Sequence, residues 1–326
     1  MEFFITTALN GLSYGLMLFM LSAGLTLTFS MMGVLNFAHA SFYMLGAYLG
    51  FSIAQSWGFW AALVLAPLAV GVLGALFERL CLRRVHALGH VPELLVTFGL
   101  SYVVLEIVQL LWGRSALDFS PPASLQGPAF TLVHRAGEGL GFVWGAPPDG
   151  VCSSLADAAL RVSCSPFPAT RALMVVVALL MLALIAALLT RTRTGLVVRA
   201  ALTHPEMVNS LGHDLPHLYM LLFGAGTALA ALAGVVGGST YLTEPAMAAS
   251  MGAMVFVVVV VGGLGSLGGA FAASLLIGVL QTAAAAADVA VLPGVTLARL
   301  APALPFVLML LMLVLRPQGL LGRPSA

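Results

Sequence analysis

The chain has 326 residues, of which 61% are hydrophobic and 8% charged, with a formal net charge of +1. A soluble domain carries roughly 45–50% apolar and about 25% charged residues, so this composition excludes a water-soluble fold and indicates a membrane protein. The near-neutral charge gives no field that would attract nucleic acid. All thirteen basic residues are arginine. Without lysine the chain has neither a P-loop nor a Schiff base, so another chain must hydrolyse any ATP that is used.

The first apolar stretch runs from Phe3 to Phe77 without a formal charge. A helix needs about 20 apolar residues to cross a hydrocarbon core of about 30 Å, so this stretch predicts three spans. The N-terminus lacks the positively charged region of a signal peptide, so we interpret the first run as a span. Nine spans are expected in all: 10–30, 35–55, 58–78, 92–112, 171–190, 217–240, two within 245–287, and 298–315.

The distribution of arginine predicts the orientation. Segments 79–90, 191–216 and 316–326 hold eight of the thirteen arginines, and they face the cytoplasm under the positive-inside rule. Two spans separate the first pair of segments and four separate the second, so the assignment is self-consistent. It predicts an all-α polytopic protein, one transmembrane domain over 1–326, with its N-terminus and the loop 113–170 outside and its C-terminus inside.

Two small-residue breaks follow the first and seventh predicted spans and suggest a weak internal repeat with broken helices. In transporters such breaks at matching places point to the translocation site. In the first break, Asn36 and His39 share a helical face and should avoid lipid, either lining a pathway or hydrogen-bonding a neighbouring helix. In the second, Gly263, Gly265 and Ser266 either line the pathway or permit close helix packing.

The segment between Arg191 and His217 is too polar for lipid and too patterned for a simple linker. Thr203 followed by Pro205 and Glu206 predicts the start of a short amphipathic helix, and Gly212 predicts its end. Such a helix between two cytoplasmic ends is either a docking element for a soluble protein or an ordinary connection.

Several segments together resemble the permeases of branched-chain amino acid ABC importers, and the LivH-type subunit more than its LivM-type companion. Matching segments cover nearly the whole chain: Asn10–Gly15, Gly24–Phe29, Gly33–His39, Arg193–Gly195 with Arg199–Ala200, Glu206–Gly212, Gly262–Ala270 and Arg316–Gly322.

The resemblance implies a permease subunit of an importer in the bacterial inner membrane. Its expected partners are a second, LivM-type permease, two cytoplasmic ATPases that hold the ATP and magnesium, and a periplasmic solute-binding protein. This chain itself is expected to be no enzyme and to hold no cofactor or metal. The resemblance also implies that 191–216 carries the coupling helix. The candidate ATPase contacts are Arg199, Glu206, Asn209, Leu211 and Gly212.

The solute and the energy source have alternatives at this stage. The resemblance implies branched-chain or other hydrophobic amino acids as the first expectation, and the few charges in the predicted spans suit a solute of low net charge. Members of the family also import urea, amides and aromatic acids. A transporter of another class, driven by an ion gradient, would need an acidic group within the membrane, and Glu106 is the nearest candidate. An intramembrane enzyme would lack a catalytic set.

The loop 113–170 is longer and richer in proline and cysteine than the family pattern. Cys152 and Cys164 lie in this loop, and on an oxidising periplasmic face we expect them to form a disulfide. A short helix between them is an open expectation. Cys81 lies in a predicted cytoplasmic segment and should stay reduced.

Overall fold

A computed structural model describes residues 2–33, 35–86, 88–135, 139–147, 152, 162–203, 205–287, 289–292 and 295–322. The longer helices are α1 (Glu2–Met32), α2 (His39–Trp57), α3 (Phe59–Phe77), α5 (His90–Trp112), α6 (Ala169–Arg191), α7 (Arg193–Thr203), α9 (Leu215–Thr240), α10 (Met247–Gly262), α11 (Leu267–Ala286) and α13 (Leu304–Leu315). Short turns are the π-helical η1 (Glu78–Leu82), α4 (Arg83–His86), η2 (Ala123–Leu125), α8 (Pro205–Ser210) and α12 (Leu297–Leu300).

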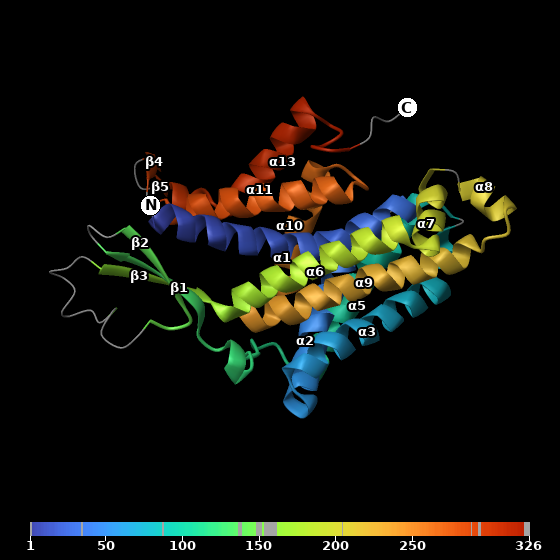
Figure 1. Ribbon diagram of the computed structural model, residues 1–326. Helices are drawn as coiled ribbons and strands as arrows, with labels where there is room; N and C mark the ends of the chain where they lie inside the picture. The colour runs from blue at the N-terminus through green and yellow to red at the C-terminus, as the bar shows by residue number, and fades with distance from the viewer. Residues whose placement is uncertain are drawn as a thin grey trace.

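Helices α1, α2 and α9 form the interior of the bundle, with the other long helices around them (Figure 1). Phe19, Tyr43, Met44 and Phe223 are almost fully buried there. The peripheral helices α3, α5, α6 and α13 instead carry exposed leucine and valine side chains. An apolar exterior around a buried core is the pattern of a helix bundle whose solvent is lipid.

Small residues let the central helices approach one another. A methyl group on Gly24 of α1 would overlap the carbonyl group of Gly226 on α9, and one on Gly234 of α9 would overlap the backbone of Tyr43 on α2. Association inside a membrane depends on such close packing, because lipid is as apolar as the side chains and gives no hydrophobic driving force.

The structure has a helix at each of the nine predicted positions. Among the described residues, six stretches are long and apolar enough for a full span: Phe3–Met32, Phe59–His86, His90–Trp112, Ala169–Arg191, Leu215–Thr240 and Leu267–Ala286. Helices α10 and α13 are shorter apolar helices, and α2 lies mainly inside the bundle. The structure is therefore that of a polytopic membrane protein, while nine spans and their orientation stay predictions.

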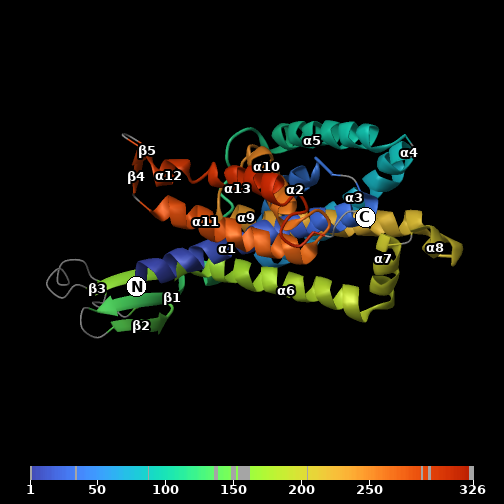
Figure 2. The same ribbon diagram turned by 90° about the horizontal axis from the view of Figure 1, so that it is seen from above.

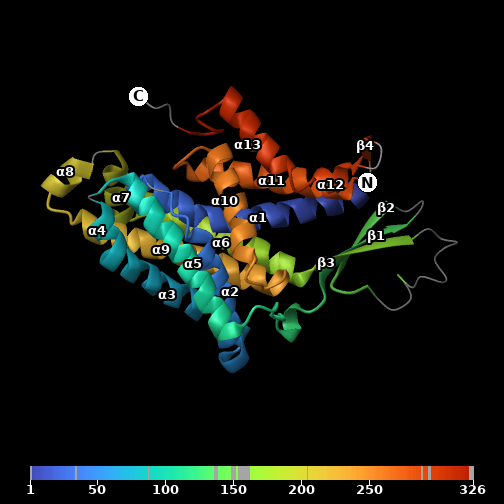
Figure 3. The same cartoon turned by 180° about the vertical axis from the view of Figure 1, so that it is seen from behind.

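The bundle has two distinct ends (Figures 1 and 3). The N-terminal end of α1 lies beside a small β-sheet at one end, which we call the sheet end. Helices α4, α7 and α8 lie together at the opposite end, which we call the α8 end. The arginines of η1, α4 and α7, with Arg191 at the last position of α6, therefore gather at the α8 end. The predicted orientation would put that end in the cytoplasm.

The expectation of a purely helical chain is wrong for the loop 113–170. Strands β1 (Pro128–Arg135), β2 (Gly139–Trp144) and β3 (Val162–Pro168) form an antiparallel sheet in the order β2-β1-β3. A second, two-stranded sheet joins β4 (Ala290–Leu292) to β5 (Val295–Thr296). Successive side chains of a strand point to opposite faces of the sheet. In β1, Phe130 and Leu132 therefore lie on one face, and the buried Thr131 and Val133 lie on the other.

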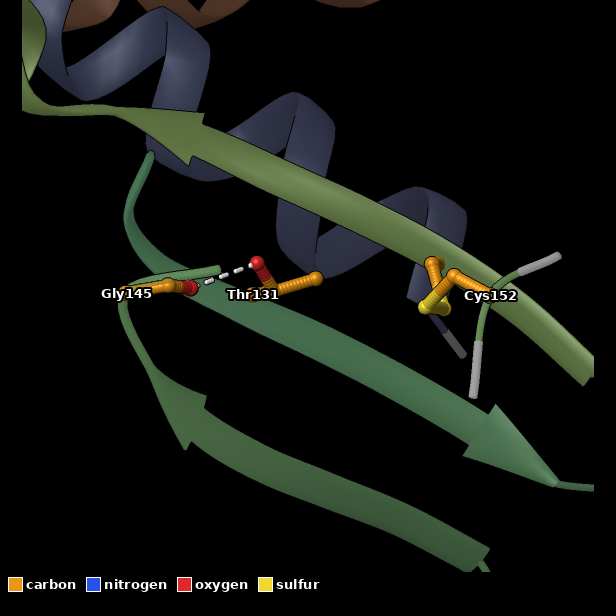
Figure 4. The surroundings of a disulfide bond; sticks show 4 residues. Thr131, Gly145 and Cys152 are labelled. Atoms are coloured by element: carbon orange, nitrogen blue, oxygen red, sulfur yellow. Dashed lines mark hydrogen bonds between the residues drawn. A yellow bond between two sulfur atoms is a disulfide. The ribbon is translucent and has the colours of Figure 1, made fainter. Parts of the chain in front are cut away.

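A disulfide joins Cys152 to Cys164 of β3, with their Cα atoms 6.1 Å apart (Figure 4). Cys81 is free and exposed. Residues 153–161, where a short helix was expected, lie outside the described part of the chain. The bond ties the segment before β3 back onto the sheet.

Candidate functional site

A cavity of about 630 Å³ lies between the beginning of α2, one face of α5 and the N-terminal two-thirds of α10 with the turn before it. Its volume lies within the roughly 300–1,000 Å³ typical of small-molecule sites. Most of its lining is apolar, and Ser41, Ser101 and Gln109 add polar groups along its length. The cavity therefore has the chemistry to receive a small amphipathic molecule.

Aromatic rings gather at one end of this cavity. Phe37 contacts Phe98 of α5 with ring centroids 6.2 Å apart, and it contacts Phe256 of α10 at 5.0 Å. Tyr102 extends the cluster, with its ring 5.1 Å from that of Phe98. Because Phe37 belongs to the break between α1 and α2, this end offers apolar contacts beside a turn in the chain.

The opposite end of the cavity carries two opposite charges, Arg114 and Glu244. The backbone brings their segments together: Leu117 donates its N–H to the carbonyl of Thr243 at 2.8 Å, as part of an antiparallel bridge. At 1.5 Å per helical residue, the sixteen positions from Phe98 to Arg114 correspond to about 24 Å. The cavity thus extends along α5 from an aromatic end to a charged end.

Asn36 and His39 do not line this cavity, although their neighbours Phe37 and Ser41 do. Both side chains are only 2% exposed. The Asn36 Oδ1 accepts the N–H of Ala38 at 3.0 Å and so shapes the turn before α2. His39 Nε2 lies 2.9 Å from the Leu21 carbonyl, while His39 Nδ1 and Asn36 Nδ2 have no hydrogen-bond partner in the described structure. Their place beside a solute route therefore stays a prediction.

Gly263, Gly265 and Ser266 form the turn between α10 and α11 and also lie outside the cavity lining. Gly263 and Gly265 have φ angles of +101° and +79°, and the Ser266 side chain caps α11 by accepting the N–H of Gly269 at 3.1 Å. The hydroxyl of Ser30 at the end of α1 donates to the Gly265 carbonyl at 2.9 Å. The two predicted breaks are therefore neighbours in space.

The chain after α13 packs against the same turn. Leu320 and Leu321 donate their N–H groups to the carbonyls of Val261 and Gly262 at 2.8 and 3.1 Å. A Cβ atom on Gly263 would lie 2.6 Å from the backbone nitrogen of Gly322. The turn thus holds α1, α10, α11 and the segment 316–322 together.

Helix α5 stands at the edge of the bundle (Figure 2). Gln109 of this helix faces the cavity, whereas Glu106 is exposed on the outer surface. A carboxylate that faces lipid in a membrane span is energetically costly. Tyr102 and Val103 are also exposed beside it.

The segment 191–216 contains two helices rather than one. Helix α8 begins at Pro205, as the sequence predicts. It ends at Ser210, and Gly212, the predicted stop, follows with a φ of +87°. Helix α7, which the sequence reasoning missed, joins α6 to α8 and exposes Arg199. On α8, Val208 is buried while Glu206 and Asn209 are exposed, and the following Leu211 is 78% exposed. An uncovered surface of mixed polarity therefore projects at the α8 end.

Sequence reasoning also missed most of the cavity lining. Ser101, Tyr102, Leu105 and Gln109 follow Phe98 at helical spacings of three, four, seven and eleven. That spacing places them on one face of α5. The face was hard to recognise because a membrane helix is apolar on all sides and has little hydrophobic contrast.

A bundle of apolar helices around an amphipathic cavity is the architecture of a membrane transport protein. A family model described as "Branched-chain amino acid transport system / permease component" matches residues 7–315, and the chain belongs to this family. Its relatives include the high-affinity branched-chain amino acid transport system permease protein BraD of Pseudomonas aeruginosa, 27% identical over 97% of this chain and 95% of the relative.

The permease protein LivH of the corresponding system is 26% identical in Salmonella typhimurium and in Escherichia coli, in each case over 99% of this chain and 97% of the relative. No solved structure gives a significant match. The similarity thus extends over nearly the whole of this chain and of each relative.

Proposed function

We propose that the chain is a permease subunit of an ABC importer that carries amino acids with apolar side chains across the bacterial inner membrane. The observation that carries the proposal is the division of the cavity into a charged end and an aromatic end. Arg114 would bind the α-carboxylate of a zwitterion and Glu244 its ammonium group, through charge-assisted hydrogen bonds. Phe37, Phe98 and Phe256 would receive the apolar side chain.

The orientation follows from the positive-inside rule, with the α8 end in the cytoplasm and the sheet end outside. The charged end of the cavity, near the ends of α5 and α9, then faces the periplasm, and the aromatic end lies toward the cytoplasm. Solute would reach the charges first and pass the rings when the conformation changes. Asn36 and His39 would border this route, and the turn with Gly263, Gly265 and Ser266 would act as its cytoplasmic hinge.

The partners are assigned to three surfaces. The outer face of α5, with Glu106, fits a second permease subunit, which would also close the open side of the cavity. The surface around Glu206, Asn209, Leu211 and Gly212, with Arg199 on α7, fits a cytoplasmic ATPase. A periplasmic solute-binding protein would deliver the solute at the sheet end. ATP and magnesium would be bound by the ATPases alone.

Purification of the tagged chain from its own cells tests the assembly. Soluble ATPases and a second permease should copurify. Reconstituted transport should require ATP on the side of the membrane where the ATPases lie. An ion-coupled transporter, the rival from another class, would work as a single chain and would stop when the ion gradient is removed, with ATP having no effect.

Charge-neutral variants of the cavity test the solute class. Arg114→Gln and Glu244→Gln should each lower amino acid uptake at saturating solute at least tenfold, whereas Arg114→Lys should retain part of it. Asp118→Asn, which changes an exposed charge in the same segment, is the matched control and should transport normally. If the solute were urea or another uncharged amide, neither Gln variant would lower uptake.

A further inference from the structure

One face of the three-stranded sheet carries a stack of aromatic rings. Phe130 of β1 lies between Phe142 of β2 and Phe167 of β3, with ring centroids 5.1 and 5.0 Å away. Trp144 packs edge-on against Phe142 at 4.9 Å. We call these four residues the aromatic face. Phe142 and Trp144 are the outer members, 52% and 80% exposed.

The other face of the same sheet is covered. Thr131 and Val133, which alternate with the aromatic positions of β1, are buried. Figure 4 shows α1 running behind the strands on the side of Thr131, whose hydroxyl donates to the Gly145 carbonyl at 2.9 Å. Of the aromatic face, Phe167 on β3 is buried at 6% exposure, so the exposed part of this face is the edge strand β2 with Phe142 and Trp144. An antiparallel sheet with one solvated face normally carries polar residues there, so exposed rings on that face require another partner.

The aromatic face lies at the level where α6 begins. Ala169, the first residue of α6, donates its N–H to the Gly127 carbonyl at 2.9 Å, directly before β1. In the first turn of α6, Arg171 donates a hydrogen bond to Asn10 of α1. The two helices therefore carry polar side chains at the same height along the bundle axis. The exposed apolar surface of α6 starts at Val176, seven residues or about 10 Å further along the helix.

From this arrangement we infer that the aromatic face rests in the lipid headgroup region of the outer leaflet, with Trp144 and Phe142 as anchors. Amphipathic aromatic rings are favoured at this depth, between the hydrocarbon and water. The four residues of the aromatic face carry no charge, and the exposed apolar surface of α6 begins about 10 Å further along the helix. The sheet would fix the tilt of α1 and α6, and the Cys152–Cys164 bond would hold β3 in place. The inference rests on membrane insertion in the proposed function and is independent of the solute.

Single-tryptophan variants test the depth of Trp144. Replacing Trp57, Trp60 and Trp112 with phenylalanine leaves Trp144 as the only indole, and the protein is reconstituted in phosphatidylcholine brominated at a shallow or a deep acyl position. Shallow bromines should quench Trp144 fluorescence at least twice as strongly as deep ones, and acrylamide should quench it only partly. Full quenching by acrylamide without quenching by either lipid would overturn the inference.

A second variant that keeps only Trp60 separates this outcome from a failure of the membrane assignment. Trp60 is exposed on α3, a stretch apolar enough to span. Quenching of Trp60 by brominated lipid with none of Trp144 refutes the aromatic anchor alone. Loss of lipid quenching for both tryptophans refutes insertion itself. A variant that keeps only Trp112, whose indole donates to Ser52 inside the bundle at 2.8 Å, should be quenched weakly by lipid.

Discussion

Gly263 is a residue at which backbone geometry strongly constrains the chain. Its φ of +101° is unfavourable for any other residue, and an added Cβ would lie 2.7 Å from the Gln318 carbonyl oxygen. Gly263→Ala should therefore destabilise the protein by about 1–3 kcal/mol or more, since strain and backbone overlap act together. The effect is measured as a lower unfolding temperature in detergent. Loss of monodispersity during heating reports the unfolding.

Gly99→Ala is the matched control for that substitution. Gly99 lies inside α5 with open space around its Cβ position, and its φ is negative. Alanine is favoured over glycine in such a place by about 0.5–1 kcal/mol, so the control should be as stable as the original protein or slightly more stable. Equal stability of both variants would contradict the role of Gly263 as a tightly packed hinge.

At the residue scale the sequence located the polar groups of the breaks but not their surroundings. Asn36, His39 and Ser266 all lie in or beside turns, as their small-residue neighbours predicted. The expectation that Asn36 and His39 share a helical face is wrong, because α2 begins only at His39 and the Asn36 side chain instead accepts a hydrogen bond in the turn before it. Their exposure was not predictable, because whether a membrane residue faces lipid, protein or water depends on helices distant in sequence. Arg114 and Glu244 are 130 positions apart, and the bridge between Leu117 and Thr243 joins their segments.

At the scale of elements, the helices were predictable and the sheet was not. Apolar stretches of about 20 residues identify helices directly, since a chain in lipid must satisfy its own backbone hydrogen bonds. In the loop 113–170, prolines and scattered charges concealed an alternation only a few residues long. The pairing of β1 with β3 also joins segments separated by the region around Cys152, a contact that no local pattern encodes.

The disulfide can be tested by counting thiols. Under denaturing, non-reducing conditions only Cys81 should react with an alkylating reagent, and reduction should reveal Cys152 and Cys164. Replacing both by serine should lower the stability of the sheet by roughly 3 kcal/mol in the chain-entropy model for a loop of this size, which limited proteolysis in the loop would report. Three free thiols in the protein from its native membrane would contradict the bond, and labelling of Cys152 from the cytoplasmic side would contradict the orientation.

The surface around α8 can be tested by charge reversal. Glu206 is exposed and touches no core, so Glu206→Arg should leave folding and insertion intact while it repels or misaligns a docked ATPase. Transport should be lost, and ATP hydrolysis by the complex should no longer respond to solute. Asp118→Arg, which reverses the charge of an exposed side chain in the loop after α5, is the control and should transport normally. Wild-type transport by Glu206→Arg would refute the coupling role.

In the molecule as a whole, the chain around the first break contacts both the cavity and the second break. Phe37 belongs to the first break and to the aromatic end of the cavity, and Ser30 ties the end of α1 to Gly265 of the second break at 2.9 Å. A movement of the α8 end would therefore reach the rings through α1 and the turn beside it. If the chain is the proposed importer subunit, this connection would be the physical route by which ATP hydrolysis in a partner chain opens the cavity.

Thiol accessibility during transport tests this coupling, in a background with Cys81→Ser. Ser101→Cys and Ala253→Cys line the cavity and should react with a water-soluble maleimide at rest. Asn36→Cys and His39→Cys, now buried, should react slowly at rest and at least several-fold faster while the assembled transporter hydrolyses ATP. Ala178→Cys, fully buried on α6, is the control and should stay unreactive in both states. If Asn36→Cys and His39→Cys also stay unreactive throughout the cycle, their role is helix packing, and the moving part of the route lies elsewhere.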